Sequence, residues 1–466
     1  MFDYQKYSTN IAIQTPSGEK WSYTTLYENV CNLSRFIKNG SLLVVLCDNT
    51  IGSLVGYLSV FEAKSTVLLL NRNLLNESIN NILSIYKPDY IWLPESQEID
   101  GQSLNHPLYL AHNYKLLQIN PCQQKLPSEL RVLLSTSGST GTPKLVRQSE
   151  RNLRSNADSI VEYLKISDGE RPITSLPMHY SYGLSVINSH LLVGATLLLT
   201  NYSYVQREFW TFAAEAKATS FSGVPYTYEI LKKIKFWNFD LPYLHTLTQA
   251  GGKLKVELIR EYTEEACTHN KNFIVMYGQT EATARISYVP TEYSLNKAGS
   301  IGVAIPNGRL EVIDTDGSVL PAGQVGELIY YGDNVCWGYA ESKEDLLLPD
   351  MNKGRLETGD IAYMDEDGFF YIVGRKKRFL KIFGNRIGLD YTEGWLQNKY
   401  GTEFICSGTD DLLCVYTTTA DINIQECRQA LASMLNLHPS AISVKIIHSI
   451  PRSDTGKILY HLLDTI

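Results

Sequence analysis

The chain has 466 residues, of which 44% are hydrophobic and 20% are charged, so it can bury a large core and is long enough for two or three domains. Its formal net charge of −7 argues against general nucleic-acid binding. The eight cysteines form no CxxC pair and no metal-ligand spacing, which predicts reduced thiols in a cytoplasmic protein.

The amino-terminal segment, MFDYQKYSTN, lacks the positive start and the apolar run of an export signal. The most apolar region, residues 42–70, is interrupted by Asp48, Asn49, Glu62 and Lys64. It therefore cannot supply the roughly 20 apolar residues of a membrane span. We expect no integral membrane association.

Short apolar runs alternate with longer amphipathic segments through most of the chain, and this alternation predicts parallel sheets covered by helices. The expected strands are Leu42–Cys47, Thr66–Leu70, Tyr90–Leu93, Val132–Ser135, Thr196–Thr200, Leu244–Thr248 and Phe273–Met276. Expected helices include Ser149–Leu164 and Val256–Cys267.

From Arg309 onward, closely spaced strands separated by turns predict a β-rich subdomain. After a strand expected at Phe369–Val373, residues 374–381 (GRKKRFLK) predict a basic turn, and a second domain is expected to begin near its lysines. The predicted domains are residues 1–376 and 377–466. Within the second, we expect two strands and a helix, at Leu412–Thr417, Ile442–Ile447 and Ile424–Leu435.

Small residues, hydroxyls and one lysine follow the strand expected at Val132–Ser135. Glycines let backbone N–H groups turn toward an anion, hydroxyls add donors, and the lysine adds positive charge, so this loop is suited to polyphosphate. It lacks the terminal Gly-Lys-Ser/Thr of the common phosphate-binding loop. A flexible loop is the alternative from composition alone. The candidate phosphate-binding residues are Ser137, Gly138, Ser139, Thr140, Gly141 and Lys144.

The segment TSGSTGTPK, residues 136–144, resembles the phosphate loop of the adenylate-forming superfamily, which includes acyl-CoA synthetases, peptide-synthetase adenylation domains and firefly luciferase. Further segments resemble family motifs and follow the family's order along the chain. They are LPMHYSYGLS (176–185), QAGGKL (249–254), YGQTE (277–281), TGD (358–360), GR (374–375) with Lys381 and Gly384, and PRSDTGK (451–457). The resemblance implies an α/β fold with a large domain of two mostly parallel, helix-flanked sheets and a small mobile α+β domain.

The resemblance also implies a nucleotide site. Thr280 would bond the α-phosphate and Glu281 would hold Mg²⁺, a cation that prefers oxygen ligands. Asp360 would accept the ribose hydroxyls, and Arg375 would contact ribose or phosphate. The adenine would lie against Tyr277, Gly278, Gly251 and Gly252.

Three further positions are carried over from the family. Lys457 would meet both the carboxylate and the bridging phosphate oxygen during adenylation, and so act as the catalytic lysine with Thr280 and Glu281. Lys377 matches the hinge about which the small domain rotates, and Gly384 matches the glycine that lines the pantetheine tunnel. Together they imply two reaction steps that end in a thioester.

The resemblance places an acyl pocket beside the nucleotide. Ser181 stands where amino-acid-activating domains usually carry Asp, so a buried α-ammonium would lack a countercharge. Arg285 could pair with a second acidic group of the substrate or brace the sheet, and His179 could equally be structural. The expected pocket edge is His179, Tyr182, Ser222, Gly223, Val224, Gln249 and Ala250.

The sequence thus predicts an AMP-forming acid–thiol ligase that uses ATP and Mg²⁺ to activate an acyl or aryl carboxylic acid. Only Glu393 remains of a Glu-x-Glu pair usual in the family, which leaves the thiol acceptor open. CoA is expected, and a separate acyl carrier protein is the alternative. A nucleotide-binding module without catalysis is the alternative from another class.

Overall fold

The structure is a computed structural model that describes residues 1–99, 106–122, 124–135, 144–376, 378–383, 385–409, 411–452 and 458–463. The chain forms two compact units. The first unit is Met1–Arg309 with Tyr331–Leu356, and the second unit is Leu310–Tyr330 with Glu357–Ile466. This division assigns part of the β-rich region to the second unit, and the expected domain boundary after residue 376 stays a prediction.

The largest sheet of the first unit has eight strands in the order β18-β9-β8-β4-β3-β5-β7-β6. The four central strands, from β8 to β5, run parallel, and antiparallel strands flank them on both sides. The strands are β3 (Leu42–Cys47), β4 (Thr66–Asn71), β5 (Tyr90–Pro94), β6 (Tyr109–Ala111), β7 (Tyr114–Gln118), β8 (Leu130–Ser135), β9 (Leu145–Ser149) and β18 (Tyr339–Ala340).

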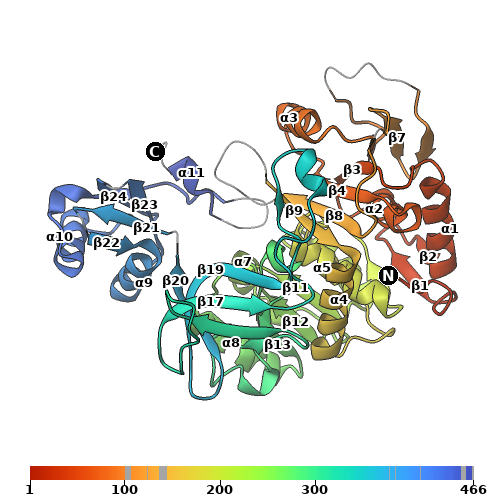
Figure 1. The fold of residues 1–466 in the computed structure, drawn as a ribbon. Helices are drawn as coiled ribbons and strands as arrows, with labels where there is room; N and C mark the ends of the chain where they lie inside the picture. Colours follow the sequence, from red (N-terminus) through yellow and green to blue (C-terminus); the bar gives the residue numbers. More distant parts are fainter. Residues whose placement is uncertain are drawn as a thin grey trace. The chain divides into compact units, whose positions relative to one another are not determined.

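Helices cover both faces of this sheet (Figure 1). Because side chains of a strand alternate between faces, Leu43 and Val45 of β3 join the core under α1 and α2, whereas Leu42 and Val44 join the core under α3. The nearly continuous apolar sequence of β3 follows from this double burial. The helices are α1 (Tyr23–Ser34), α2 (Ile51–Ala63) and α3 (Asn76–Tyr86).

The second sheet of the first unit has the order β11-β12-β13-β14-β15. Its first three strands are parallel and in register, with Gly223 beside Gln249 and Gln249 beside Val275, so their carboxyl ends meet at one edge. The strands are β11 (Ser220–Gly223), β12 (Thr246–Gln249), β13 (Asn272–Tyr277), β14 (Ser287–Tyr288) and β15 (Val303–Ala304). The helices of this region are α4 (Glu150–Leu164), α5 (Ser181–Leu192), α6 (Arg207–Glu215), α7 (Pro225–Lys233) and α8 (Val256–Thr268).

The segment expected as a strand at residues 196–200 is shorter than predicted and lies in neither large sheet. Only β10 (Leu197–Leu198) is regular, and it pairs with β1 (Ile11–Gln14) in a small sheet that β2 (Lys20–Ser22) completes. The partners of this strand lie more than 180 residues earlier in the chain, so local sequence could not assign it.

The second unit contains the sheet β16-β17-β19-β20, the hairpin β21-β22 and the sheet β23-β24-β25. Residues 374 and 375, expected to begin the basic turn, instead end β20, because they pair with Ile361 and Asp360 of β19. The strands are β16 (Arg309–Ile313), β17 (Gly326–Tyr331), β19 (Arg355–Met364), β20 (Phe370–Arg375), β21 (Phe379–Ile382), β22 (Asn385–Gly388), β23 (Phe404–Thr409), β24 (Leu412–Thr417) and β25 (Ile442–Ile446). The helices are α9 (Leu389–Tyr400), α10 (Ile424–Leu435) and α11 (Tyr460–Leu463).

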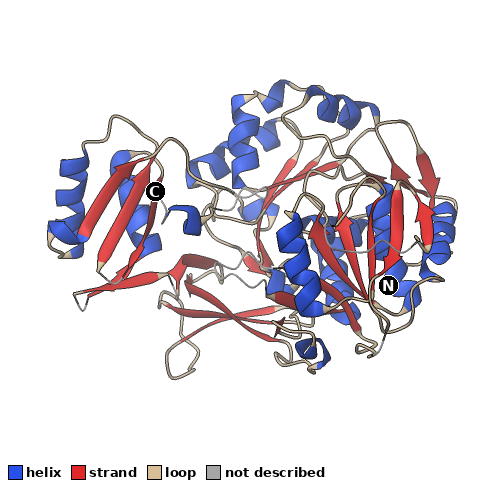
Figure 2. Cartoon of the chain, turned by 90° about the horizontal axis from the view of Figure 1, so that it is seen from above, coloured by secondary structure: helices blue, strands red, loops and turns tan. Residues whose placement is uncertain are grey.

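The expected α/β class is therefore confirmed, with mostly parallel sheets flanked by helices and a β-rich region before the carboxyl-terminal α+β segment (Figure 2). Among the described residues, no helix combines the length and apolarity that crossing a membrane requires.

Candidate nucleotide and acyl site

The predicted phosphate loop connects β8 and β9, which form an antiparallel pair with Ser135 opposite Leu145. Ser137, Gly138, Ser139, Thr140 and Gly141 lie outside the described residues. Lys144 is described, and its Nζ lies 2.7 Å from a carboxylate oxygen of Glu341. Both side chains are about half exposed, which leaves the lysine accessible to an anion.

β9 also supports the segment that carries the predicted catalytic pair. Gln148 Nε2 donates to the Thr280 carbonyl over 2.9 Å. The Arg147 side chain is fully buried and donates to the carbonyls of Trp337 (2.8 Å) and Tyr339 (3.2 Å). Neither residue was expected to contribute, because each reaches a segment more than 130 residues later.

Thr280 and Glu281 lie in the short 3₁₀ helix η2 (Thr280–Ala282), immediately after β13. Thr280 Oγ1 lies 3.2 Å from Ser181 Oγ at the start of α5. Tyr339 Oη donates to Glu281 Oε1 over 2.6 Å. Burial is the larger cause that raises the pKa of Tyr339, and the Glu281 carboxylate is the second. The hydroxyl therefore fixes the direction of a carboxylate that could hold a cation.

The turn before η2 requires glycine at residue 278. A Cβ there would lie 1.7 Å from the Ala284 carbonyl oxygen, a separation that no side chain tolerates. Beside it, Gln279 Nε2 donates to Tyr277 Oη over 3.0 Å. Close passage of the two backbone segments thus explains the glycine without any ligand.

A second glycine turn follows the neighbouring strand β12. Gly251 has a φ of +83°, and a Cβ there would lie 2.4 Å from Tyr180 Oη. Gln249 Nε2 donates to the Gly252 carbonyl over 3.0 Å and closes the turn. Since Gly251 requires both a left-handed backbone and close approach, its place in the QAGG motif has a conformational cause.

The predicted acyl-pocket residues of β11, β12 and α5 lie together. Tyr182, Val224 and Ala250 belong to one buried apolar cluster. Thr248 Oγ1 lies 2.8 Å from Tyr182 Oη and 2.9 Å from Ser222 Oγ, so three hydroxyls form a chain beside it. Gly223 lies under α7, where a Cβ would approach Thr227 and Tyr228 at 2.9 Å. His179 is partly buried on the segment before α5.

Arg285 is buried beside these residues. Its guanidinium lies 3.9 Å from the centre of the Tyr182 ring, and only 2% of the residue is exposed. Burial raises the pKa of Tyr163 to about 12, although the Arg285 guanidinium acts in the opposite direction. The Arg285 guanidinium therefore acts on the Tyr163 hydroxyl, and the two side chains are hydrogen-bonded.

In the second unit, Asp360 and Arg375 are paired across the strands β19 and β20. Arg375 Nε lies 3.2 Å from Asp360 Oδ1. The Asp360 side chain is almost fully buried, whereas that of Arg375 is 64% exposed. The pair leaves the guanidinium accessible for a contact with ribose or phosphate.

Lys377, Gly384 and Lys457 lie outside the described residues. The residues that flank the predicted lysine loop, Arg452 and Ile458, form an antiparallel bridge, and Arg452 Nη2 lies 2.6 Å from Glu403 Oε1. Glu393, noted above for the family's acid pair, instead accepts from the Cys406 N–H (2.7 Å) and from Arg378 (2.9 Å). Its position is therefore explained by the core of the second unit.

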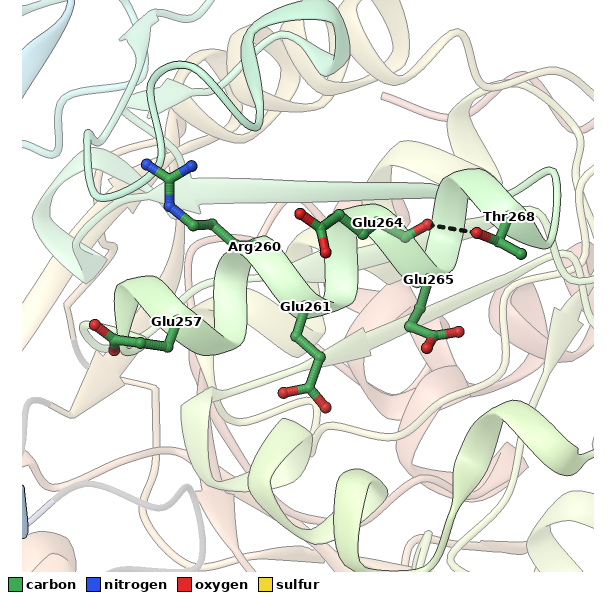
Figure 3. A pocket seen from close by; sticks show the side chains of 6 residues that line it. All are labelled: Glu257, Arg260, Glu261, Glu264, Glu265 and Thr268. Atoms are coloured by element: carbon green, nitrogen blue, oxygen red, sulfur yellow. Dashed lines mark hydrogen bonds between the residues drawn. The ribbon is translucent and has the colours of Figure 1, made fainter.

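Another pocket lies along α8 on the first unit (Figure 3). Thr268 Oγ1 donates to the Glu264 carbonyl over 3.0 Å, Glu261 pairs with Lys232, and Glu265 lies 3.7 Å from His269. These partners belong to the same or a neighbouring helix, so the pocket is a solvated helix face rather than part of the site. Its lining residues are Glu257, Arg260, Glu261, Glu264, Glu265 and Thr268.

A family model and several individual relatives match this chain over most of its length. The family model described as AMP-binding enzyme matches residues 3–340. Peroxisomal OPC-8:0-CoA ligase 1 of Arabidopsis thaliana is 25% identical over 96% of this chain and 88% of its own length. A long-chain-fatty-acid–CoA ligase of Escherichia coli O6:H1 is 27% identical over 75% of this chain, which spans only 64% of that ligase.

Among solved structures, O-succinylbenzoate coenzyme A synthetase from Bacillus subtilis, in complex with ATP and magnesium ion, matches with a TM-score of 0.77. It is 20% identical, and the match covers 99% of this chain and 98% of that one, so the two share a fold. Because the family model covers well over half of the sequence, the chain belongs to the AMP-binding enzymes, as an acyl-CoA synthetase-like, AMP-forming acid–thiol ligase of the adenylate-forming superfamily.

Proposed function

We propose that this chain joins a carboxylic acid to the thiol of CoA in two steps. A carboxylate oxygen first attacks the α-phosphorus of ATP, the bond from that phosphorus to the bridging oxygen breaks, and pyrophosphate leaves. The CoA sulfur then attacks the acyl carbon of the adenylate, the thiol proton passes to solvent, and AMP leaves. The acid is of the acyl or aryl class rather than an α-amino acid.

The observation that carries this proposal is the shared edge of β11, β12 and β13. Their parallel, in-register carboxyl ends lead into Val224, the Gly251 turn and the Thr280–Glu281 pair. In open α/β sheets, ligands bind outside the carboxyl ends of the parallel strands. β13 is the last strand of this parallel run, because its other neighbour, β14, is antiparallel to it.

The residues present suit ATP and Mg²⁺, which the similar Bacillus subtilis structure holds. Glu281 is one oriented carboxylate, and Mg²⁺ is usually bound by one or two carboxylates together with substrate phosphates. When bound, the cation would neutralise charge that develops on the phosphates. No group of three or more acidic, histidine or cysteine side chains suited to a metal occurs among the described residues, which fits a cation shared with the nucleotide.

Two features of the acyl pocket support the exclusion of α-amino acids. Ser181, at the position where a countercharge would stand, is a neutral side chain that contacts Thr280. Arg285 is a buried cation on the same side of the sheet, and it would repel an α-ammonium group. Both observations favour a substrate without positive charge.

The roles of Lys457, Lys377 and Gly384 are proposed from their motifs alone. We assign adenylation to Lys457, the hinge to Lys377 and the thiol tunnel to Gly384. A cytoplasmic location stays a prediction, and the Arabidopsis relative is named as peroxisomal.

The test is ATP–pyrophosphate exchange with a panel of carboxylic acids, followed by addition of CoA or of a pantetheinylated carrier protein. We expect exchange with at least one acid and thioester formation with CoA. Thioester formation only with the carrier would favour the alternative acceptor. ATP binding without exchange for any acid would favour a nucleotide-binding module.

The same assay tests Lys457. Lys457→Ala should lower exchange by about 100-fold or more, on the order of 3 kcal/mol of transition-state stabilisation, while ATP binding persists. Lys399→Ala removes an exposed lysine of α9 and serves as the matched control. Near-normal exchange in Lys457→Ala would contradict the assignment.

A further inference from the structure

A small internal cavity of about 20 Å³ lies among β11, β12, α4 and α5 in the first unit. This volume is enough for about one water molecule. Its walls are mixed, because Ile160, Leu164 and Val186 are apolar while Ser222, Thr248 and Arg285 are polar. The cavity lies next to the hydroxyl chain of the acyl pocket, since Ser222 and Thr248 belong to both.

Arg285 is the unusual member of this lining. A guanidinium stays charged in proteins, and burying it without an anion is costly. Among the described residues, no ion pair of Arg285 with a carboxylate is found, and its buried Nε has no hydrogen-bond partner, although the guanidinium is hydrogen-bonded to the Tyr163 hydroxyl. The Tyr182 ring lies 3.9 Å from the guanidinium and stabilises part of its positive charge. The ring does not replace an acceptor for the N–H groups at the edge of the guanidinium.

The acidic side chain in the lining of the cavity, Glu170, does not neutralise Arg285. Its carboxylate accepts from Thr219 Oγ1 at 2.5 Å and lies 3.4 Å from His245 Nε2. The Glu170 carboxylate is therefore already bound by Thr219 and His245 rather than by Arg285. The buried guanidinium therefore remains without an anion of its own.

The hydroxyls near Arg285 also favour a polar occupant. Tyr182, Thr248 and Ser222 bond one another in a chain, and these two bonds use two of the three hydroxyl hydrogens, so one hydrogen is left to donate to an acceptor. A long alkyl chain would leave this hydrogen without an acceptor, at a cost of about 1–3 kcal/mol.

We propose that the acid activated by this chain is a short dicarboxylic acid, whose second carboxylate pairs with Arg285 while the first attacks ATP. This inference rests on the proposed adenylating function. Arg285 is then a specificity-determining residue that supplies the charge complementary to the far end of the substrate. Its two Nη groups and Nε match the bidentate geometry of a carboxylate.

The main experiment uses the unaltered chain. Pyrophosphate exchange is measured with malonate, succinate, glutarate and adipate, each compared with its half-amide and with the monocarboxylic acid of equal chain length, and with hexadecanoate. We expect kcat/KM for the best diacid to exceed both of its analogues by about 100-fold, because each analogue leaves a buried charge unpaired. We expect no exchange with hexadecanoate.

The outcomes are distinguishable. Equal exchange with monoacids or with hexadecanoate overturns the dicarboxylate inference and leaves the adenylating function standing. Absence of exchange with every acid overturns the adenylating function and the inference together.

A substitution of Arg285 tests whether the preference for diacids depends on this residue. Arg285→Gln should lower kcat/KM for the diacid by about 100-fold more than kcat/KM for the matched monoacid. Arg285→Lys, which keeps the charge, should retain part of the preference. Arg151→Gln is the matched control, since Arg151 is 76% exposed and pairs with Asp333 on the surface. An undiminished diacid preference in folded Arg285→Gln overturns the role of Arg285, and if that variant does not fold, the Lys variant and the substrate panel decide.

Discussion

Tyr339 Oη donates a 2.6 Å hydrogen bond to Glu281 Oε1, across 58 residues of sequence. Glu281 is the carboxylate proposed to hold Mg²⁺, and Tyr339 lies on the short strand β18 beside β9. The edge of the eight-stranded sheet thus orients a carboxylate that follows the second sheet. Both residues belong to the first unit, so this contact does not depend on where the second unit lies.

Tyr339→Phe removes this hydrogen bond and keeps the ring. A hydrogen bond to a charged group contributes about 1.5–3 kcal/mol, so we expect exchange at limiting Mg²⁺ to fall by about 10- to 100-fold. Titration of Mg²⁺ in the exchange assay measures the change. Tyr243→Phe is the control, because Tyr243 is half exposed and only its ring contacts Lys217. An unchanged Mg²⁺ requirement in Tyr339→Phe would contradict the orienting role.

Gly278→Ala should destabilise the first unit strongly. The added Cβ would lie 1.7 Å from the Ala284 carbonyl oxygen, and both segments are fixed backbone. We expect a loss of at least about 3 kcal/mol, or failure to fold, as measured by thermal and urea unfolding.

Gly169→Ala provides the comparison within the same unit. The nearest atom to a Cβ at residue 169 is Ser167 Oγ at 3.6 Å, an ordinary contact. We expect a change within about 0.5 kcal/mol. Equal stability of the two variants would show that the turn before η2 can open.

The sequence predicted those elements of the fold whose pattern lies in neighbouring residues, and it missed those that depend on contacts between distant segments. The strand at 412–417 and the helix at 424–435 occur with the predicted bounds, because alternation and helical periodicity are properties of neighbouring residues. β6 and β7 were missed, since their pairing with β5 depends on contacts made after folding. A buried arginine such as Arg147 also escapes prediction, because its carbonyl partners begin 190 residues later.

The same distinction applies to the candidate site, where residues within motifs were predicted and the residues that support them were not. Motif resemblance located Tyr182, Ser222, Val224 and Ala250, which the structure brings together. The supporting residues Gln148 and Tyr339 carry no motif, because their roles arise only when β9 and β18 pair beside η2. A Tyr directly after a Trp-Gly pair gives no local signal of a carboxylate partner 58 positions away.

Glu393→Gln should destabilise the second unit. The Glu393 side chain is 17% exposed, and it accepts from Arg378 at 2.9 Å and from the Cys406 N–H at 2.7 Å. Removing its charge leaves Arg378 partly uncompensated, which typically costs about 3–5 kcal/mol for a buried pair. Asp333→Asn, at an exposed pair, should cost at most about 1 kcal/mol. Urea unfolding compares the two, and equal small losses would mean that Asp390, the other acid beside Arg378, suffices.

His190 gives the first unit a defined sensitivity to acid. Burial in α5 lowers its pKa to about 4, although the Val186 carbonyl, 2.8 Å from Nδ1, and the charge of Glu170 act in the opposite direction. In the unfolded chain, where the pKa is about 6.5, His190 binds a proton more readily than in the folded chain, so stability falls as pH decreases from 6.5 to 4. A difference of roughly 2.5 units corresponds to about 3 kcal/mol at most.

His190→Asn should remove this part of the acid sensitivity. Since carboxylates titrate in the same range, the measurement is the difference between the two chains, each unfolded in urea at pH 7 and at pH 4.5. Tryptophan fluorescence follows the first unit, which holds five of the six tryptophans. We expect the unaltered chain to lose about 2–3 kcal/mol more than His190→Asn between the two pH values. Parallel losses in both chains would mean that His190 becomes protonated without unfolding, and that its surroundings, Glu170 included, accommodate the charge.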